Sequence, residues 1–241
     1  MTVEIMKTAS FETRNPLIIV GFPGIGLVGS VATAYFVEKN GFEMVGYVTS
    51  NDFAPLAAIH NYKPLPPVRI YFSKSLNIMV IMGEIVVPVS ISNDLAHKIM
   101  EFAGELKATR IISVGGISMR ESESAVYLVG NEQSNVDSFV SKKLGKSIKE
   151  GATTGVTGTL LAVSGLSGYS MLAVLAEASP DFVDPKAASN ALQVLSKIIS
   201  VPINTLELEK EARTLAQGAK ESAIKSKALG KKGGPEGGMY G

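Results

Sequence analysis

The sequence predicts an α/β fold: one large domain of packed strands and helices, followed by a C-terminal appendage. Short apolar runs bounded by Gly or Pro, such as Leu17–Val20, are typical of strands buried on both faces. Segments with helical spacing alternate with these runs. The 241 residues are 46% hydrophobic and include 24 glycines, which indicates closely packed layers joined by tight turns.

Composition excludes several classes of function. The formal net charge is +1, which gives no electrostatic basis for nucleic acid as the main partner. The chain has no cysteine, so disulfides, thiolate nucleophiles and Cys-ligated zinc are excluded. No apolar stretch is long enough to span a membrane, and the N-terminal segment with its early Glu4 does not resemble a secretory signal. We therefore expect a cytoplasmic protein.

The N-terminal part reads as a strand, a Gly-rich turn, a helix and a second strand. Val3–Lys7 alternates and predicts an edge strand, and Leu17–Val20 predicts a buried one. Gly21–Gly29 (GFPGIGLVG) follows directly, and Ser30–Val37 continues with helical spacing. Met44–Thr49 predicts the next strand, so the unit is of βαβ type.

Gly24, Gly26 and Gly29 match the GxGxxG fingerprint of dinucleotide-binding folds. Asp52 lies beyond the next strand, where a ribose-binding acid would be expected. However, Pro23 removes a backbone donor from the loop that should bind phosphate, and the strand-to-glycine turn is longer than usual. Close packing of a helix on the sheet explains the glycines equally well and is the interpretation that we favour.

Phe53–Pro67 is rich in Pro and aromatic residues, which predicts a surface or contact loop. It contains His60, which has no evident catalytic partner in the sequence and is interpreted as a surface histidine. Val68–Phe72 and Asn77–Met82 then predict a β-hairpin. Glu84 follows that hairpin and is interpreted as a capping or ion-pairing carboxylate.

The second half continues the alternation of strands and helices. Ser90 or Ser92 can cap the first helix of this half. Gly115-Gly116 is expected to end the strand Arg110–Val114. The predicted elements are a helix at Asn93–Leu106, strands at Arg110–Val114 and Ala125–Val129, a helix at Val136–Leu144, a strand at Ser170–Glu177, and a helix from Asp184-Pro185 to Ile199.

Gly151–Thr159 is a second loop rich in Gly and Thr, and Thr157 or Thr159 can cap the helix that follows it. Amide donors and hydroxyls at a helix N-terminus can hold an anion. The loop lacks the Lys of a phosphate-binding P-loop, and tight packing at an oligomer interface explains it at least as well. Both interpretations remain open.

The C-terminal segment predicts an appendage with a recognition tip. Residues 1–203 form the expected core, and Asn204 or Thr205 can cap a last helix that covers 204–230. The Lys-rich second half of that helix should project from the core. Residues 231–241 should form a flexible tail, because its Gly and Pro residues bury too little apolar surface. Met239, Tyr240 and Gly241 place an apolar side chain, a phenol and a carboxylate at its end.

The sequence shows no chemistry typical of an enzyme. It contains no paired carboxylates, no nucleophile beside a base, no metal-ligand cluster and no ATPase signature, and it has only two histidines. We therefore predict no catalytic residues, no cofactor and no metal.

Five motifs together resemble the proteasome assembly chaperone family, in its archaeal homologue branch, from about Leu17 to Ile199. They are GFPGIGLVG (21–29), Gly83-Glu84, Gly115-Gly116, GATTGVTGTLL (151–161) and LAEASPDFVDPKAA (175–188). The resemblance implies a single α/β domain of phosphorylase/nucleosidase-like architecture, with a mixed sheet flanked by helices. It also implies a homo-oligomer, or an assembly with a paralogue, that engages the α-subunits of the 20S proteasome.

Met239-Tyr240-Gly241 is similar to the hydrophobic–Tyr–any residue terminus of proteasome activators and some assembly chaperones. The resemblance assigns Tyr240 and the carboxylate of Gly241 to pockets between α-subunits, where a Lys meets the carboxylate, with Met239 as the apolar contact. It implies an ATP-independent chaperone or activator that is not an enzyme. The alternative is a nucleotide- or nucleoside-binding α/β enzyme that uses the Gly-rich loops.

Overall fold

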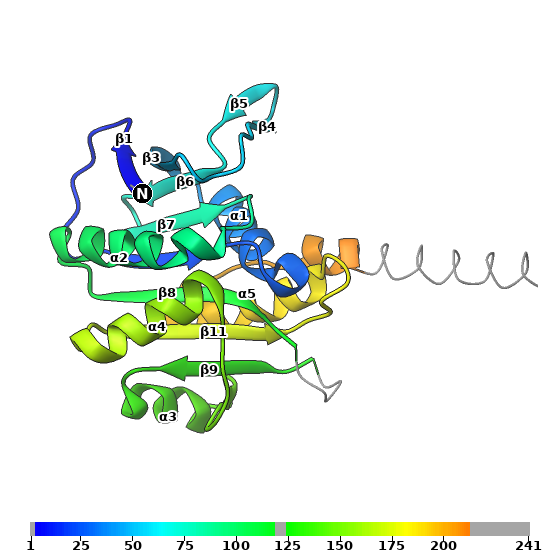
Figure 1. Cartoon of the computed structure of the whole chain (residues 1–241). Helices are drawn as coiled ribbons and strands as arrows, with labels where there is room; N and C mark the ends of the chain where they lie inside the picture. Colours follow the sequence, from blue (N-terminus) through cyan, green and yellow to red (C-terminus); the bar gives the residue numbers. More distant parts are fainter. Residues whose placement is uncertain (1–2, 119–123, 213–241) are drawn as a thin grey trace, which may run out of the picture.

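The computed structural model describes residues 3–118 and 124–212 (Figure 1). Strands and helices alternate along most of the chain, as the sequence predicts. The strands are β1 (Val3–Lys7), β2 (Leu17–Gly21), β3 (Glu43–Ser50), β4 (Ala58–His60), β5 (Lys63–Leu65), β6 (Val68–Ser73), β7 (Ile78–Gly83), β8 (Arg110–Ile117), β9 (Val126–Gly130), β10 (Lys146–Ser147) and β11 (Met171–Glu177). The helices are η1 (Ile25–Leu27), α1 (Val28–Lys39), α2 (Val89–Glu105), α3 (Gln133–Ser141), α4 (Gly155–Ser167) and α5 (Pro185–Ile199).

Nine strands of the described residues form one mixed sheet, in the order β1-β3-β6-β7-β2-β8-β11-β9-β10. The central strands β7, β2, β8 and β11 are parallel to one another. The flanking pairs β1–β3, β3–β6, β6–β7 and β11–β9 are antiparallel. The predicted mixed sheet is therefore confirmed.

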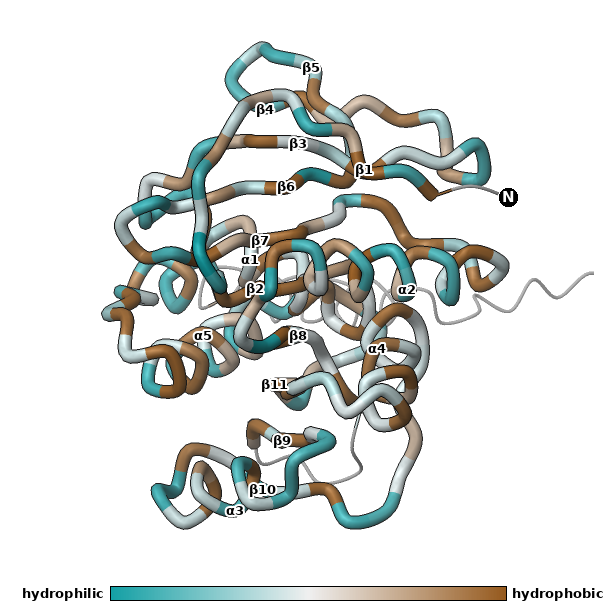
Figure 2. The backbone as a smooth tube through the Cα atoms, turned by 90° about the vertical axis from the view of Figure 1, so that its left-hand side faces the viewer, coloured by the Kyte–Doolittle hydropathy of each residue, from teal (hydrophilic) through white to brown (hydrophobic). Residues whose placement is uncertain are grey.

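Helices cover both faces of this sheet (Figure 2). On one face, α2 and α4 pack together, and their apolar side chains, among them Ile91, Ile99 and Leu160, are buried against the sheet. On the other face, α1 and α5 pack together and bury Phe36 and Leu192. Strands buried on both faces need continuous apolar runs, which explains the character of β2, β7 and β8.

Of the helices α1 to α5 in the described residues, only α5 begins with a side-chain capping hydrogen bond. Asp184 caps α5 as predicted, since its Oδ1 accepts a hydrogen bond of 2.9 Å from the backbone N–H of Ala187. For α2, neither Ser90 nor Ser92 is the cap. The helix begins at Val89, and Ser92 instead donates from Oγ to the carbonyl of Pro88 at 3.1 Å.

The sequence also misplaces the end of β8. Gly115-Gly116 was expected to end this strand, but β8 continues through both glycines to Ile117. The reason is a close backbone approach, because a Cβ at Gly116 would lie 2.0 Å from the carbonyl oxygen of Ile25. Only glycine allows the loop that contains Ile25 to cross the strand at this distance.

The unit β2–α1–β3 differs from a dinucleotide-binding βαβ unit. Strands β2 and β3 are parallel, but β7 and β6 lie between them in the sheet. The segment 53–67, predicted as a loop, contains the short antiparallel hairpin β4–β5. This hairpin stands above the main sheet (Figure 1).

The packing of α1 on the sheet predicts an unusual response to alanine. In most helices a Gly→Ala substitution stabilises. At Gly29, however, the new Cβ would lie 2.5 Å from the carbonyl oxygen of Phe22 and 2.7 Å from that of Val114. We expect Gly29→Ala to lower the free energy of unfolding by about 2–3 kcal/mol in urea denaturation.

Gly24→Ala is the control within the same fingerprint, because no atom lies within 4 Å of a Cβ at Gly24. This change should alter the free energy of unfolding by about 0.5 kcal/mol or less. Equal effects of the two substitutions would contradict the packing role of Gly29.

Candidate functional site

The candidate site is the edge of the sheet at which the parallel strands β7, β2, β8 and β11 end, called here the carboxyl edge. Ligands of open α/β sheets bind in crevices at this edge. The segments 22–27, 84–88 and 178–184 leave the sheet there, and the hairpin β4–β5 rises from the same edge between β3 and β6. Figure 1 shows it on the right.

The first Gly-rich loop is packed against this edge. Gly26 has φ +62°, and a Cβ on it would lie 2.7 Å from Cβ of Ala178. Its carbonyl accepts a hydrogen bond of 2.9 Å from the backbone N–H of Asp184. The loop is thus fitted to the segment after β11, which supports the packing interpretation of GxGxxG over phosphate binding.

The second Gly-rich loop is also tied to its own fold. Oγ1 of Thr157 lies 2.7 Å from Oγ of Ser113 in β8. Oγ1 of Thr159 donates to Oδ1 of Asn93 in α2 at 3.2 Å. Helix α4 begins at Gly155, before Thr157 and Thr159, so the predicted caps at these two residues are wrong; Thr154 holds the N-cap position without a side-chain capping hydrogen bond. These hydroxyls bind α4 to its neighbours.

A charged cluster that sequence reasoning missed lies at the base of the hairpin. The side chain of Arg69 in β6 is only 2% exposed and forms an ion pair with Glu84, at the end of β7. Nη1 of Arg69 also donates to the carbonyl of Pro66 at 3.2 Å, whereas its buried Nε has no hydrogen-bond partner. Burial raises the pKa of Tyr71, over whose ring the guanidinium lies at 5.9 Å.

His60 of β4 completes this cluster. Its Nε2 lies 2.9 Å from Oε1 of Glu84, and because a carboxylate only accepts, we assign the proton to Nε2. His60 is half exposed, in agreement with its interpretation as a surface residue, and Glu84 is an ion-pairing residue as predicted. The Arg69–Glu84–His60 cluster therefore fastens the hairpin to the sheet.

Exposed apolar side chains gather at the carboxyl edge. Eleven large apolar side chains are exposed in the described residues, and eight of them belong to segments at this edge. The eight are Leu27, Leu56, Ile59, Tyr62, Val86, Val89, Phe182 and Val183. Exposed apolar patches mark sites that contact proteins, membranes or ligands, so the carboxyl edge is the candidate binding surface.

The start of the predicted appendage also lies on the core. Asn204 caps the helical segment 206–212, since its Oδ1 accepts from the backbone N–H of Leu206 at 3.0 Å. Leu208 is buried, and Glu207 pairs with Lys39 of α1 at 2.6 Å. Ser189 Oγ lies 3.5 Å from Glu209, so the segment runs back along α5 towards the carboxyl edge. The rest of the expected helix and tail, with Met239, Tyr240 and Gly241, lies outside the described residues.

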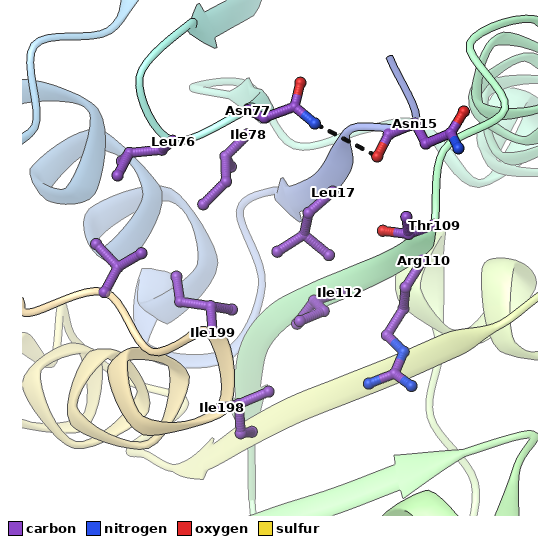
Figure 3. Close-up of a pocket in the computed structure, with 11 residues that line it drawn as sticks. Asn15, Leu17, Leu76, Asn77, Ile78, Thr109, Arg110, Ile112, Ile198 and Ile199 are labelled. Atoms are coloured by element: carbon purple, nitrogen blue, oxygen red, sulfur yellow. Dashed lines mark hydrogen bonds between the residues drawn. The ribbon is translucent and has the colours of Figure 1, made fainter. Parts of the chain in front are cut away.

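The opposite edge of the sheet carries a hollow of about 370 Å³ (Figure 3). Aliphatic side chains from β2, β8 and the end of α5, such as Leu17, Ile112 and Ile198, surround it. Arg110 lies at its side, where Nε donates to Oγ of Ser170 at 3.0 Å. The lining contains no pair of groups suited to acid–base chemistry.

The described residues lack two further kinds of site. Within 3–118 and 124–212, no group of three or more His, Asp or Glu side chains is placed to hold a metal ion. No helix in these ranges has the length and apolar character that a membrane span requires.

Comparison with known proteins places the chain among relatives of the same size. A model of the PAC2 family matches residues 18–223. An uncharacterized protein of Methanocaldococcus jannaschii is 29% identical over 222 residues, which are 92% of this chain and 91% of that protein.

Two solved structures are similar over almost the whole chain. PbaA of Pyrococcus furiosus, described as an archaeal homolog of proteasome-assembly chaperone, has a TM-score of 0.84 and 27% identity, over 96% of each chain. PbaB of the same organism, described as an archaeal proteasome activator, has a TM-score of 0.82 and 24% identity, over 92% of this chain and 99% of that one. At 24% identity, the similarity to PbaB shows a shared fold and nothing more.

Because the guanidinium of Arg69 is buried, the stability of the fold should depend on its ion-pair partner Glu84. Glu84→Ala would leave the guanidinium unpaired, and we expect it to lower the free energy of unfolding by about 3 kcal/mol, measured by chemical denaturation. Glu101→Ala is the matched control. Glu101 forms a surface ion pair with Lys98 at 2.8 Å, and its loss should cost about 0.5 kcal/mol or less. A small loss in both variants would show that the cluster does not hold the hairpin.

Proposed function

Because this chain belongs to the PAC2 family, we propose that it is a proteasome-binding chaperone or activator without enzymatic activity. Family membership confirms the resemblance predicted from the sequence. The likeness to PbaA, an archaeal homolog of proteasome-assembly chaperone, supports the proteasome as the partner of this chain as well. The proposal includes a phosphorylase/nucleosidase-like architecture for this α/β domain, which serves binding here.

The observation that carries the proposal is the apolar character of the carboxyl edge. At the position where α/β enzymes bind small ligands, the first Gly-rich loop is packed against the sheet through Gly26 and Gly29, and large side chains such as Val86 and Val89 are exposed. An edge of this composition suits a protein surface as partner.

In the proposed mechanism, the C-terminal tails dock on the α-ring of the 20S proteasome. Tyr240 and the carboxylate of Gly241 enter pockets between α-subunits, and Met239 provides the apolar contact. The segment 206–212, which precedes the appendage, runs towards the carboxyl edge. A homo-oligomer, alone or with a paralogue, would present several tails, and each tail after the first would bind intramolecularly.

The proposed action is independent of ATP. Without ATP hydrolysis, the effect on the proteasome must come from binding energy alone. A bound protein shifts an equilibrium between two conformations or assembly states only by its differential affinity for them. The protein would therefore promote assembly, or open the gate of the particle, by binding one arrangement of α-subunits more tightly than another.

The tail proposal predicts that deletion of Met239–Gly241, or Tyr240→Ala, weakens co-sedimentation with 20S proteasomes. We expect an apparent affinity lower by at least about tenfold, because a buried aromatic anchor commonly dominates binding energy. Glu236→Ala, outside the three-residue tip, is the control and should bind like the unchanged chain. Unchanged binding of the deleted chain would refute docking through the tail.

A further inference from the structure

The turn of the hairpin β4–β5 contains a residue that its backbone disfavours. His60 pairs with Lys63, so Asn61 and Tyr62 form a two-residue turn, and both have positive φ, +49° and +65°. Such turns favour Asn followed by Gly, because a bulky side chain is strained at positive φ. Tyr62 nevertheless occupies the glycine position with its side chain fully exposed. Neither local geometry nor packing within the described residues explains this tyrosine.

Residues 53–67, which include the hairpin and its turn, are called here the arm. The arm is apolar and basic. Ile59 is 72% exposed beside the turn, and Leu56 is also exposed. The arm carries Lys63 and His60 but no carboxylate from 53 to 67. Its tip would therefore fit an apolar surface that is bordered by acidic groups.

The described residues contain a surface of that kind on the segment after β11. Phe182 is 65% exposed and Val183 is 42% exposed. Leu27 is exposed on the Gly-rich loop, which is hydrogen-bonded to this segment through Gly26 and Asp184. Between 177 and 186 the chain carries three carboxylates and one ammonium group, and the carboxylate of Asp181 is exposed. Leu27, Asp181, Phe182 and Val183 are called here the patch.

The arm and the patch of one molecule are too far apart to meet. The arm rises beside β6, and three strands, β7, β2 and β8, lie between β6 and β11. Four strand spacings of roughly 4.8 Å separate the two by about 19 Å. Figure 1 shows the hairpin β4–β5 rising away from α5, the helix that begins just after the patch residues 181–183.

We propose that the arm of one copy docks on the patch of a second copy of this chain. Ile59 and Tyr62 would cover Phe182 and Val183, and Lys63 would face Asp181. The two surfaces differ, so the contact is heterologous and repeats from copy to copy, closing into a ring when the rotation permits. All copies in such a ring would direct their carboxyl edges the same way. The inference rests on the proposed homo-oligomer and names the surfaces that form it.

Tyr62→Gly is the sharpest test, because glycine relieves the positive φ and the variant should fold at least as well as the unchanged chain. Sedimentation equilibrium of the full chain measures association. We expect the unchanged chain to form oligomers. In Tyr62→Gly, association should be weaker on the order of tenfold or more, so that monomer accumulates, and the melting temperature should be equal or higher. A monomeric unchanged chain, or a variant that associates equally well, would overturn the inference.

A charge exchange tests the orientation of the contact. Lys63→Glu and Asp181→Lys should each weaken association, and the double variant should restore it, since opposite charges then face each other again. A double variant weaker than either single variant would overturn the pairing. These measurements use no proteasome, so their failure is separate from failure of the proposed function, which the tail deletion tests.

Discussion

The structure depends on the close approach of backbones where the central strands end. Gly29 brings α1 against the carbonyls of Phe22 and Val114, and Gly116 lets the loop at Ile25 cross β8. A side chain at either glycine would push the loop away from the strands. This contact lies at the carboxyl edge, where open α/β sheets bind their ligands. Gly29, which belongs to the nucleotide-like fingerprint, therefore serves the packing of the loop and helix at this edge.

The side chains that are exposed at the carboxyl edge belong to the segments that connect its strands to the following elements. These segments expose aliphatic and aromatic side chains, whereas apolar side chains are buried on both faces of the sheet. The arm is held upright by a buried cation, which is costly to bury without its carboxylate partner. Rigid support of an exposed apolar hairpin lowers the entropy that is lost on binding. Membership of the PAC2 family and the likeness to PbaA agree with a protein whose work is binding.

Sequence reasoning located most elements, because continuous apolar runs and caps such as Asp184 are local signals. It missed β4–β5, whose strands have three residues each and include Pro64, and it ended β8 at glycines that a distant loop requires. It saw His60 and Glu84 as separate residues, since only the pairing of β6 with β7 brings Arg69 and Glu84 together. An arginine within an apolar strand run was the one signal that could have revealed this cluster. The roles of Met239, Tyr240 and Gly241 stay predictions.

The central claim is that this protein binds the proteasome end-on, with its carboxyl edge towards the α-ring. Electron microscopy of the full chain mixed with 20S proteasomes tests this claim most directly. We expect additional density on the α-ring surface, with the carboxyl edge and the end of the segment 206–212 facing the ring. Particles without additional density, or density in which the opposite edge with its aliphatic hollow faces the ring, would contradict it.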